Sequence, residues 1–147
     1  MKVSTKGEYG IRALLELTKR YGEGYVLSSD IAAARSIPEN YLYQLLITLR
    51  KAGIIRSRRG PQGGHMLARA PQDISVADAL LALEGPLEPT LCVQEDIVND
   101  CPYHEGCAMR EVWQLVTDAT SEVLRSTRFD ALAEREGQLR RVASTAD

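Results

Sequence analysis

The fold is set by residues 28–67, which read SSDIAAARSIPENYLYQLLITLRKAGIIRSRRGPQGGHML. A short helix is predicted over residues 29–35, with the Ser28 hydroxyl capping its start. Because proline is tolerated in the first turn of a helix, Pro38 opens a further helix, whose leucines recur at helical spacing until Gly53. Two short helices joined by a tight turn form a helix-turn-helix, and the second of them is the element that can enter a major groove.

A short hairpin is predicted directly after these helices. Residues 54–57 and 65–68 alternate in part between apolar and polar side chains, and residues 58–64 between them are rich in glycine and arginine. A glycine-rich tip lets the backbone approach a phosphate chain closely, and a guanidinium can enter a narrow minor groove. The hairpin is therefore interpreted as a wing.

Helices are also expected on both sides of this stretch. Ser4 or Thr5 can cap a first helix that runs to about Arg20, and Ser75 can cap a later one. From Ala108 on, apolar residues repeat at intervals of three and four along a narrow seam, which indicates a long helix that packs against a partner helix. The predicted fold class is thus mainly α with a small β-wing: a winged helix-turn-helix plus a long dimerisation helix.

Charge is distributed unevenly along the chain. The net charge is -2 and the pI is about 5.7, which by themselves argue against a nucleic-acid partner. Residues 50–69, however, contain six basic side chains and no acidic one, whereas residues 84–105 contain six acids and no lysine or arginine. A local basic patch is sufficient for binding phosphates, whatever the global pI.

Composition and the amino end narrow the class of protein. With 147 residues, of which 44% are hydrophobic and 26% charged, the chain is expected to be an ordinary globular protein. No apolar run is long enough for a membrane span and the amino end lacks a secretory signal, so we expect a cytoplasmic protein. An enzyme is not expected, because neither a nucleophile-base set nor a nucleotide-binding glycine loop is apparent.

The helix after Pro38 and the basic hairpin supply the candidate DNA contacts. Asn40 and Gln44 lie four apart, hence on one helix face, and their amides can read base edges, adenine in particular. Alternatively, Asn40 and Gln44 are ordinary polar surface residues that contact no DNA, and the hairpin is a solvated turn whose charge is incidental. The candidate DNA-binding residues are Ser28, Glu39, Asn40, Tyr41, Tyr43, Gln44, Arg50, Lys51, Arg58, Arg59, Gly60, Gly63 and Gly64.

Three cysteines lie within or just after residues 86–106, a stretch with no helical or strand periodicity. Cys92, Cys101 and Cys107 are separated by eight and then five residues, unlike the C-x-x-C pairs of zinc ribbons or thioredoxin-like sites. This spacing suits a loop around something larger than one tetrahedral ion, such as an iron-sulfur cluster, whose ligands are mostly cysteine. Free reduced thiols are the alternative, because spacing alone does not show that the sulfurs converge.

A cluster held by three thiolates leaves one ligand position to another side chain. The candidates are His104 in the loop, His65 in the hairpin, or a carboxylate such as Glu8 contributed by a second subunit. Glu8 also has a simpler explanation, because a carboxylate in the first turn of a helix interacts favourably with the helix dipole.

Several of these segments together resemble the Rrf-type winged-helix transcriptional regulators, the group that includes IscR, NsrR and RirA. The residues that carry the resemblance are KVSTKGEY at 2–9, YL at 41–42, QL at 44–45, LRKAG at 49–53, ISVADA at 74–79 and, most specifically, RGP and GG within 59–64. The likeness continues through the cysteines to the helix around Trp113, and so spans nearly the whole chain. It implies a homodimer with swapped long helices that binds palindromic operators in double-stranded DNA.

The resemblance also assigns roles to individual positions. It implies recognition-helix contacts by Asn40, Tyr41 and Gln44. It further implies that Arg59 reaches the minor groove and that the three cysteines are cluster ligands.

Two departures from the IscR-like pattern bear on the fourth ligand. The histidine that IscR-like members carry three residues after the last cysteine is here Arg110, and the first cysteine gap is longer. The arrangement is closer to the NsrR and RirA branch, in which an acidic residue at the start of the first helix can complete the cluster from the partner subunit. That likeness implies that Glu8 of the partner subunit is the fourth ligand of the 2Fe-2S or 4Fe-4S cluster. His104, which the loop itself offers, is the alternative.

Taken together, these features predict a DNA-binding regulator that senses redox, nitric oxide or iron status through the cluster. The alternatives are a cluster-free winged-helix regulator that uses a thiol switch or zinc, and an iron-sulfur electron-transfer protein. Four regions are expected. They are a winged helix-turn-helix DNA-binding domain (1–85), a cysteine cluster-binding loop (86–107), a dimerisation helix region (108–136) and a flexible tail (137–147).

Overall fold

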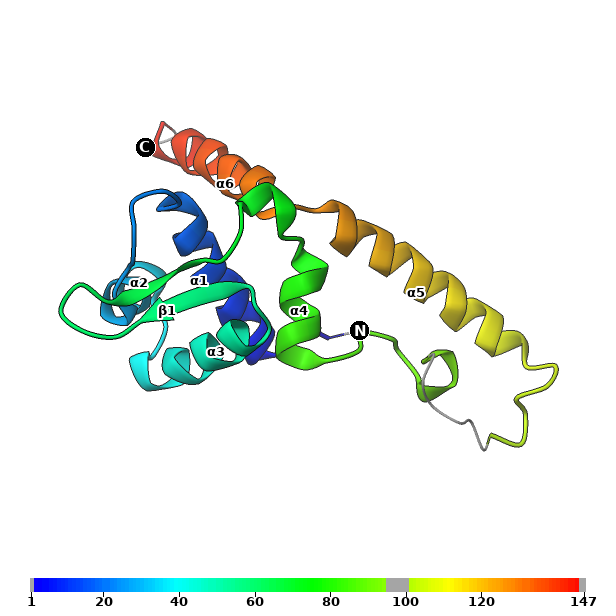
Figure 1. Cartoon of the computed structure of the whole chain (residues 1–147). Helices are drawn as coiled ribbons and strands as arrows, with labels where there is room; N and C mark the ends of the chain where they lie inside the picture. The colour runs from blue at the N-terminus through cyan, green and yellow to red at the C-terminus, as the bar shows by residue number, and fades with distance from the viewer. Residues whose placement is uncertain (1, 95–100, 146–147) are drawn as a thin grey trace.

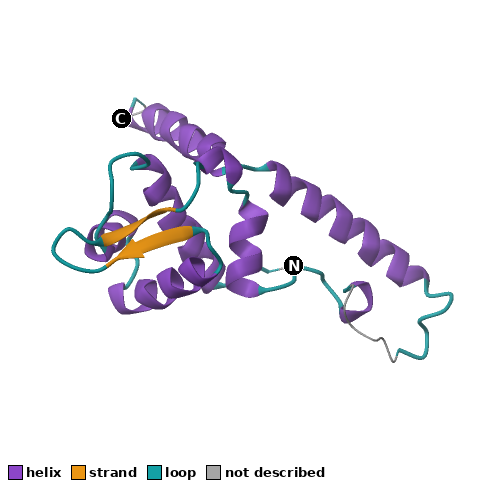
Figure 2. Cartoon of the chain, viewed as in Figure 1, coloured by secondary structure: helices purple, strands orange, loops and turns teal. Residues whose placement is uncertain are grey.

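The computed structural model of the chain describes residues 2–94 and 101–145. In these ranges a winged helix is followed by a long helical arm, and the last helix lies beside the first helix of the winged helix (Figure 1). The elements are α1 (Thr5–Lys19), α2 (Ser28–Arg35), α3 (Glu39–Lys51), β1 (Ile55–Arg58), β2 (Gly64–Leu67), α4 (Val76–Glu84), α5 (Ala108–Ser126) and α6 (Phe129–Ser144), with single 3-10 turns at Pro71–Asp73 and Leu91–Val93. Figure 2 shows the two strands as the only sheet among many helices in the described chain. The predicted fold class is confirmed.

The helix-turn-helix is formed by α2 and α3, which pack on α1. Ser36 between them adopts a left-handed backbone conformation, with φ of 52°, and the next residue is buried. The leucines of α3 that were predicted to face inward, at positions 42, 45, 46 and 49, are all buried. The predicted cap of α2 is wrong: Leu27 occupies the cap position without a side-chain hydrogen bond, and Ser28 is the first helical residue. The bridge between Val26 and His65 ends directly before Leu27, whose carbonyl already accepts a hydrogen bond of 3.2 Å from the Ile31 N–H, so the helix begins one residue earlier than predicted.

The wing is the antiparallel hairpin of β1 and β2, extended on one side by Val26. The backbone N–H and C=O of Val26 exchange two hydrogen bonds of 2.8 Å with His65. Gly64 has φ of +135°, and a Cβ atom at this position would lie 2.4 Å from the Val26 carbonyl oxygen. A Cβ at Gly63 would lie 2.1 Å from the Arg58 carbonyl oxygen. Side chains are excluded at both positions, so these two glycines shape the wing itself.

Capping begins α1 and α4 as the sequence predicts. The Ser4 hydroxyl accepts a hydrogen bond of 3.3 Å from the Gly7 N–H. Ser75 and Asp78 form a capping box with reciprocal hydrogen bonds of 3.1 and 2.8 Å. The two helices pack against each other over the core. Each of them is therefore fixed both by its cap and by the burial of its apolar side chains.

The C-terminal region differs from the expectation. The sequence analysis expected one helical region over 108–136 and a flexible tail. In the structure α5 stops at Ser126, and α6 continues to Ser144 and so includes residues 137–144. The helices are separated because the backbone at Thr127 is extended and its carbonyl accepts a hydrogen bond of 3.0 Å from the Val76 N–H. Phe129, the first residue of α6, is fully buried in the core and anchors the returning helix.

The long helix α5 extends away from the winged helix (Figure 1) and buries none of its own residues. Its apolar side chains Met109, Val112, Leu115, Val116 and Val123 are exposed. Among the described residues, no helix combines the length and apolar character needed to cross a membrane. Within one protomer α5 contacts mainly α4 and the 3-10 turn at Leu91–Val93 among the described elements, so packing stabilises its position less than that of the other long helices.

Candidate nucleic-acid interface and cysteine segment

The exposed face of α3 carries the polar residues that the sequence analysis singled out. Glu39, Asn40, Tyr43 and Gln44 are exposed, whereas the opposite face of the helix lies in the core. Asn40 and Gln44 are separated by about one helical turn, so both amides lie on the same side. The helix thus presents hydrogen-bonding groups that can reach base edges.

Tyr41 of the same helix is held by α1. Its ring meets the ring of Tyr9 edge to face, with centroids 5.8 Å apart and an interplanar angle of 75°. The guanidinium of Arg12 lies 5.4 Å from the centroid of that Tyr9 ring. Tyr41 keeps 37% of its surface exposed, so it packs on α1 and still borders the exposed face of α3.

The two arginines at the start of the wing tip have different surroundings. The Arg58 guanidinium lies over the Tyr25 ring, 4.4 Å from its centroid, and donates a hydrogen bond of 2.7 Å to the Gln62 carbonyl. Arg59 is exposed and, in the part of the chain that the structure describes, pairs with no carboxylate. Arg58 therefore fixes the wing tip through contacts that the sequence did not indicate, while Arg59 is available to a ligand.

His65, one of the candidates for a fourth metal ligand, belongs to the wing sheet. Its Nδ1 lies 2.8 Å from the Ser57 hydroxyl. Burial, and after it the positive charge of Arg50, lowers the pKa of His65 below its ordinary value. The imidazole is accordingly neutral near pH 7, and within residues 2–94 and 101–145 it belongs to no group of three side chains able to bind a metal.

The cysteine segment runs from Cys92 to Cys107, and both of these residues lie beside the start of α5. Cys92 lies in the 3-10 turn, where its Sγ is 3.1 Å from the Thr90 hydroxyl and its carbonyl accepts a hydrogen bond of 3.1 Å from Arg110 Nε. Cys107 occupies the cap position of α5. Cys101 is exposed on the connecting loop, and none of the three forms a disulfide in the described chain.

A cavity of about 480 Å³ lies at the same end of α5. Its lining includes His104, Cys107, Arg110, Glu111, Gln114 and Leu115. Two of the proposed ligand types, a thiol and an imidazole, therefore face one cavity. Glu8 instead forms an ion pair with Arg12 one turn later in α1, and 54% of its side chain is exposed.

The cysteine segment fits an iron-sulfur cluster by the chemistry of its donors but not yet by their geometry. Three thiols and a histidine between positions 92 and 107 are the ligand types that such clusters use. Among the described residues, however, no three His, Cys, Asp or Glu side chains are close enough together to hold a metal ion. A cluster would therefore require the segment to close around it, with a further ligand from a second subunit or from His104.

A buried ion-pair network that joins α1, α2 and α6 was not indicated by any sequence pattern. Its central residue, Arg35, is bonded to Glu136, which lies 101 positions away. Periodicity and motif spacing act over a few turns at most, so they do not detect such a pair.

Comparisons with known proteins agree on one group of regulators. The profile of the Rrf2 family, described as "Iron-dependent Transcriptional regulator", matches residues 3–135. The chain is 41% identical over 133 residues to the HTH-type transcriptional regulator CymR of Bacillus subtilis, a match that covers 90% of each protein. The solved structure of CymR, described as the global cysteine regulator of B. subtilis, matches with a TM-score of 0.77 and 39% identity, over 92% of this chain and 98% of that one.

Two further solved structures belong to the same comparison. IscR of T. potens matches with a TM-score of 0.72 and 37% identity, over 94% of this chain and 90% of that one. The oxidised form of Staphylococcus aureus CymR matches with a TM-score of 0.70 and 36% identity, over 91% and 97% of the respective chains.

Proposed function

Because the chain belongs to the Rrf2 family of DNA-binding transcriptional regulators, we propose that it reads operator DNA with α3 and the wing, and senses a signal at its cysteine segment. Family membership makes it a regulator and not an enzyme. The resemblance seen in the sequence is confirmed, as is the winged-helix fold.

The exposed polar face of α3 carries the proposal for DNA reading. Asn40 and Gln44 contact base edges in the major groove, and Arg59 enters the neighbouring minor groove. Ser28 opens α2, where unpaired backbone N–H groups and the helix dipole favour a phosphate. The other proposed contacts are Glu39, Tyr41, Tyr43, Arg50, Lys51 and the wing backbone at Gly60 and Gly63. Arg58 and Gly64 act mainly by shaping the wing.

We further propose a homodimer in which α5 packs against a second copy of the chain. The support is the row of exposed apolar side chains on a helix none of whose residues is fully buried in its own protomer. A two-fold dimer presents two α3 helices, so it binds a palindromic operator with two half-sites. A protein bound to operator DNA acts in the cytoplasm, where we propose that it works.

For the signal, we propose an iron-sulfur cluster held by Cys92, Cys101 and Cys107. Glu8 of the partner subunit, or His104, completes the set of ligands. Such a group supplies sensitivity to redox state, nitric oxide or iron supply. The support is the donor chemistry of the segment, its attachment to the start of α5, and the description of the family as iron-dependent.

A second candidate is a cluster-free regulator in which the cysteines respond to thiol chemistry or bind zinc. It is favoured by the separation of the donor side chains in the described protomer. The relative described as a global cysteine regulator, and the oxidised form of its counterpart, also point in this direction.

Metal analysis of anaerobically purified wild-type protein separates the two candidates. The cluster proposal expects iron and acid-labile sulfide in about equal amounts, both lost in Cys92→Ala and in Cys107→Ala. A colourless protein that takes up neither after reconstitution, or that contains zinc alone, contradicts it. The affinity for a duplex enriched from a random pool is then measured with and without iron, with Cys92→Ala as the matched control that cannot hold the cluster.

A further inference from the structure

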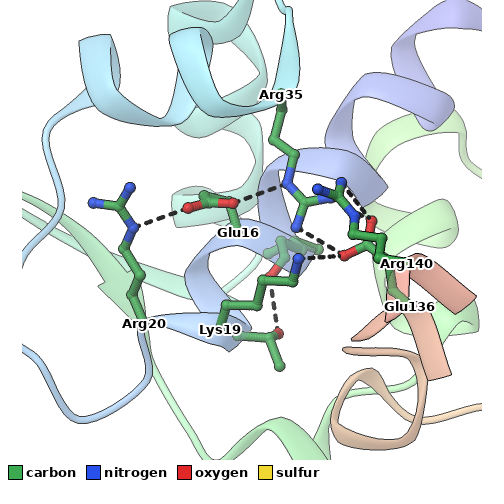
Figure 3. A network of polar contacts seen from close by, with 8 residues as sticks. Glu16, Lys19, Arg20, Arg35, Glu136 and Arg140 are labelled. Atoms are coloured by element: carbon green, nitrogen blue, oxygen red, sulfur yellow. Dashed lines mark hydrogen bonds and ion pairs between the residues drawn. The ribbon is translucent and has the colours of Figure 1, made fainter. Parts of the chain in front are cut away.

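A buried arginine joins the C-terminal helix to the helix-turn-helix (Figure 3). Arg35 is the last residue of α2, and only 5% of its side chain is exposed. Its Nε donates to Glu16 Oε2 of α1 at 3.0 Å. Its Nη1 and Nη2 donate to Glu136 Oε1 and Oε2 of α6 at 2.7 and 3.2 Å. A guanidinium fork that is held by one carboxylate on two nitrogens and by another on the third is fixed in position and direction.

Both carboxylates are also bonded to cations nearer the surface. Arg20 Nε lies 2.9 Å from Glu16 Oε1, and Lys19 Nζ lies 2.6 Å from Glu136 Oε2. Hydrogen bonding from Arg35 is the main reason that the pKa of Glu136 falls to about 2. Glu136 is therefore ionised near neutral pH, so its pairing with Arg35 acts as a constant connection rather than a pH switch.

Arg35 lies where a displacement would reach the recognition helix. The next residue, Ser36, forms the left-handed turn of the helix-turn-helix, and α3 begins at Glu39. On the other side, Glu136 lies in the middle of α6, which follows α5 after a link of two extended residues. One side chain thus connects the C-terminal helices to the turn that orients α3.

We propose that Arg35 is a positioning residue for operator binding. Its contacts with Glu16 and Glu136 set the orientation of the turn relative to α6, so operator affinity depends on a helix outside the DNA-reading surface. Removing one carboxylate leaves a buried guanidinium short of partners, which loosens the turn without deleting a DNA contact. The inference rests on the proposed reading of DNA by α3, and on no property of the cysteines.

The test compares Glu136→Gln with Glu134→Gln, an exposed carboxylate on the same helix. Binding is measured by fluorescence anisotropy on two duplexes, one enriched from a random pool by the wild-type protein and one of random sequence. We expect Glu136→Gln to lose about tenfold in affinity for the enriched duplex. Its affinity for the random duplex and its salt dependence stay at wild-type values, because phosphate contacts are unchanged. Glu136→Asp keeps the charge, so its affinity for the enriched duplex should lie between those of Glu136→Gln and the wild type. Glu134→Gln should have the wild-type affinity.

Two results overturn the proposal. One is a folded Glu136→Gln protein that binds the enriched duplex as the wild type does, and the other is an equal loss on both duplexes. If Glu136→Gln does not fold, Arg35→Lys is tested in its place, because it keeps the buried charge but loses the bidentate pairing. Wild-type affinity for the enriched duplex, or an equal loss on both duplexes, then overturns the proposal in the same way. A wild-type protein that enriches no sequence contradicts the proposed function itself, which is a distinct failure from normal enrichment with an insensitive Glu136→Gln.

Discussion

The winged helix and the long helix α5 are stabilised in different ways. Helices α1 to α4 and the hairpin share one buried core, to which Phe129 at the start of α6 also belongs. None of the 19 residues of α5 is buried, and most of its large apolar side chains are exposed. The core of the winged helix is therefore complete within one protomer, whereas α5 leaves an apolar row exposed that the proposed dimer would cover.

The largest difference is expected between a leucine of the core and one of α5. Leu45 is 1% exposed and Leu115 is 69% exposed. Leu45→Ala should lower the free energy of unfolding by about 2–5 kcal/mol, because it leaves a cavity in the core beneath α3. Leu115→Ala should change unfolding only at concentrations where the chain is dimeric. Urea denaturation at several protein concentrations measures the free energy of unfolding of both variants. Equal losses of stability in the two variants at every concentration would contradict the comparison.

A smaller effect is expected from two glycines, one in each half. Gly64→Ala should destabilise the protein by about 1–3 kcal/mol, because its backbone conformation and the nearby Val26 carbonyl exclude a side chain. Gly137 lies within α6 with nothing near its Cβ position, so Gly137→Ala should stabilise by about 0.5–1 kcal/mol. Thermal melts compare the two variants, and opposite signs are the expected outcome.

Within the wing, the two arginines should separate DNA contact from wing shape. Arg59→Ala should weaken DNA binding by about 1 kcal/mol and reduce the salt slope by about one, since the positive charge proposed to enter the minor groove is lost. Arg58→Ala should leave the salt slope nearly unchanged, because this guanidinium is already engaged with Tyr25 and Gln62. The measurement is the DNA affinity of each variant over a series of salt concentrations. A wild-type salt slope in Arg59→Ala would contradict the proposed contact.

The smallest effect concerns the acid stability of the ion-pair network. The pKa of Glu136 is about 2 in the folded protein, below its ordinary value of 4.5. The group therefore contributes stability that is fully present above about pH 4.5 and is lost as the pH falls toward 2. Stability curves between pH 5 and 2 should fall less steeply in Glu136→Gln than in the wild type, while Glu134→Gln should follow the wild type.

Local patterns in the sequence predict the winged helix well. The leucine spacing of α3, the caps at Ser4 and Ser75, and the glycine-rich wing depend on residues a few positions apart, so they are visible without a structure. The cap of α2 was misplaced because the pairing of Val26 with the wing is a tertiary contact.

The C-terminal half was harder to predict for a physical reason. Residues 137–144 have a polar composition, but their helix is anchored by Phe129 in the core and by the Glu136 pair with Arg35. Neither contact leaves a periodic signal. The gathering of the cysteines stays a prediction, because their spacing does not determine where the sulfurs lie and residues 95–100 fall outside the described chain.

Hydrogen exchange of the wild-type protein across a dilution series tests the central difference most directly. We expect amides of α5 to lose protection as the chain is diluted below its dimer dissociation constant, while those of α3 stay protected. Equal protection of α5 and α3 in the monomer, or loss of both together on dilution, would contradict the account.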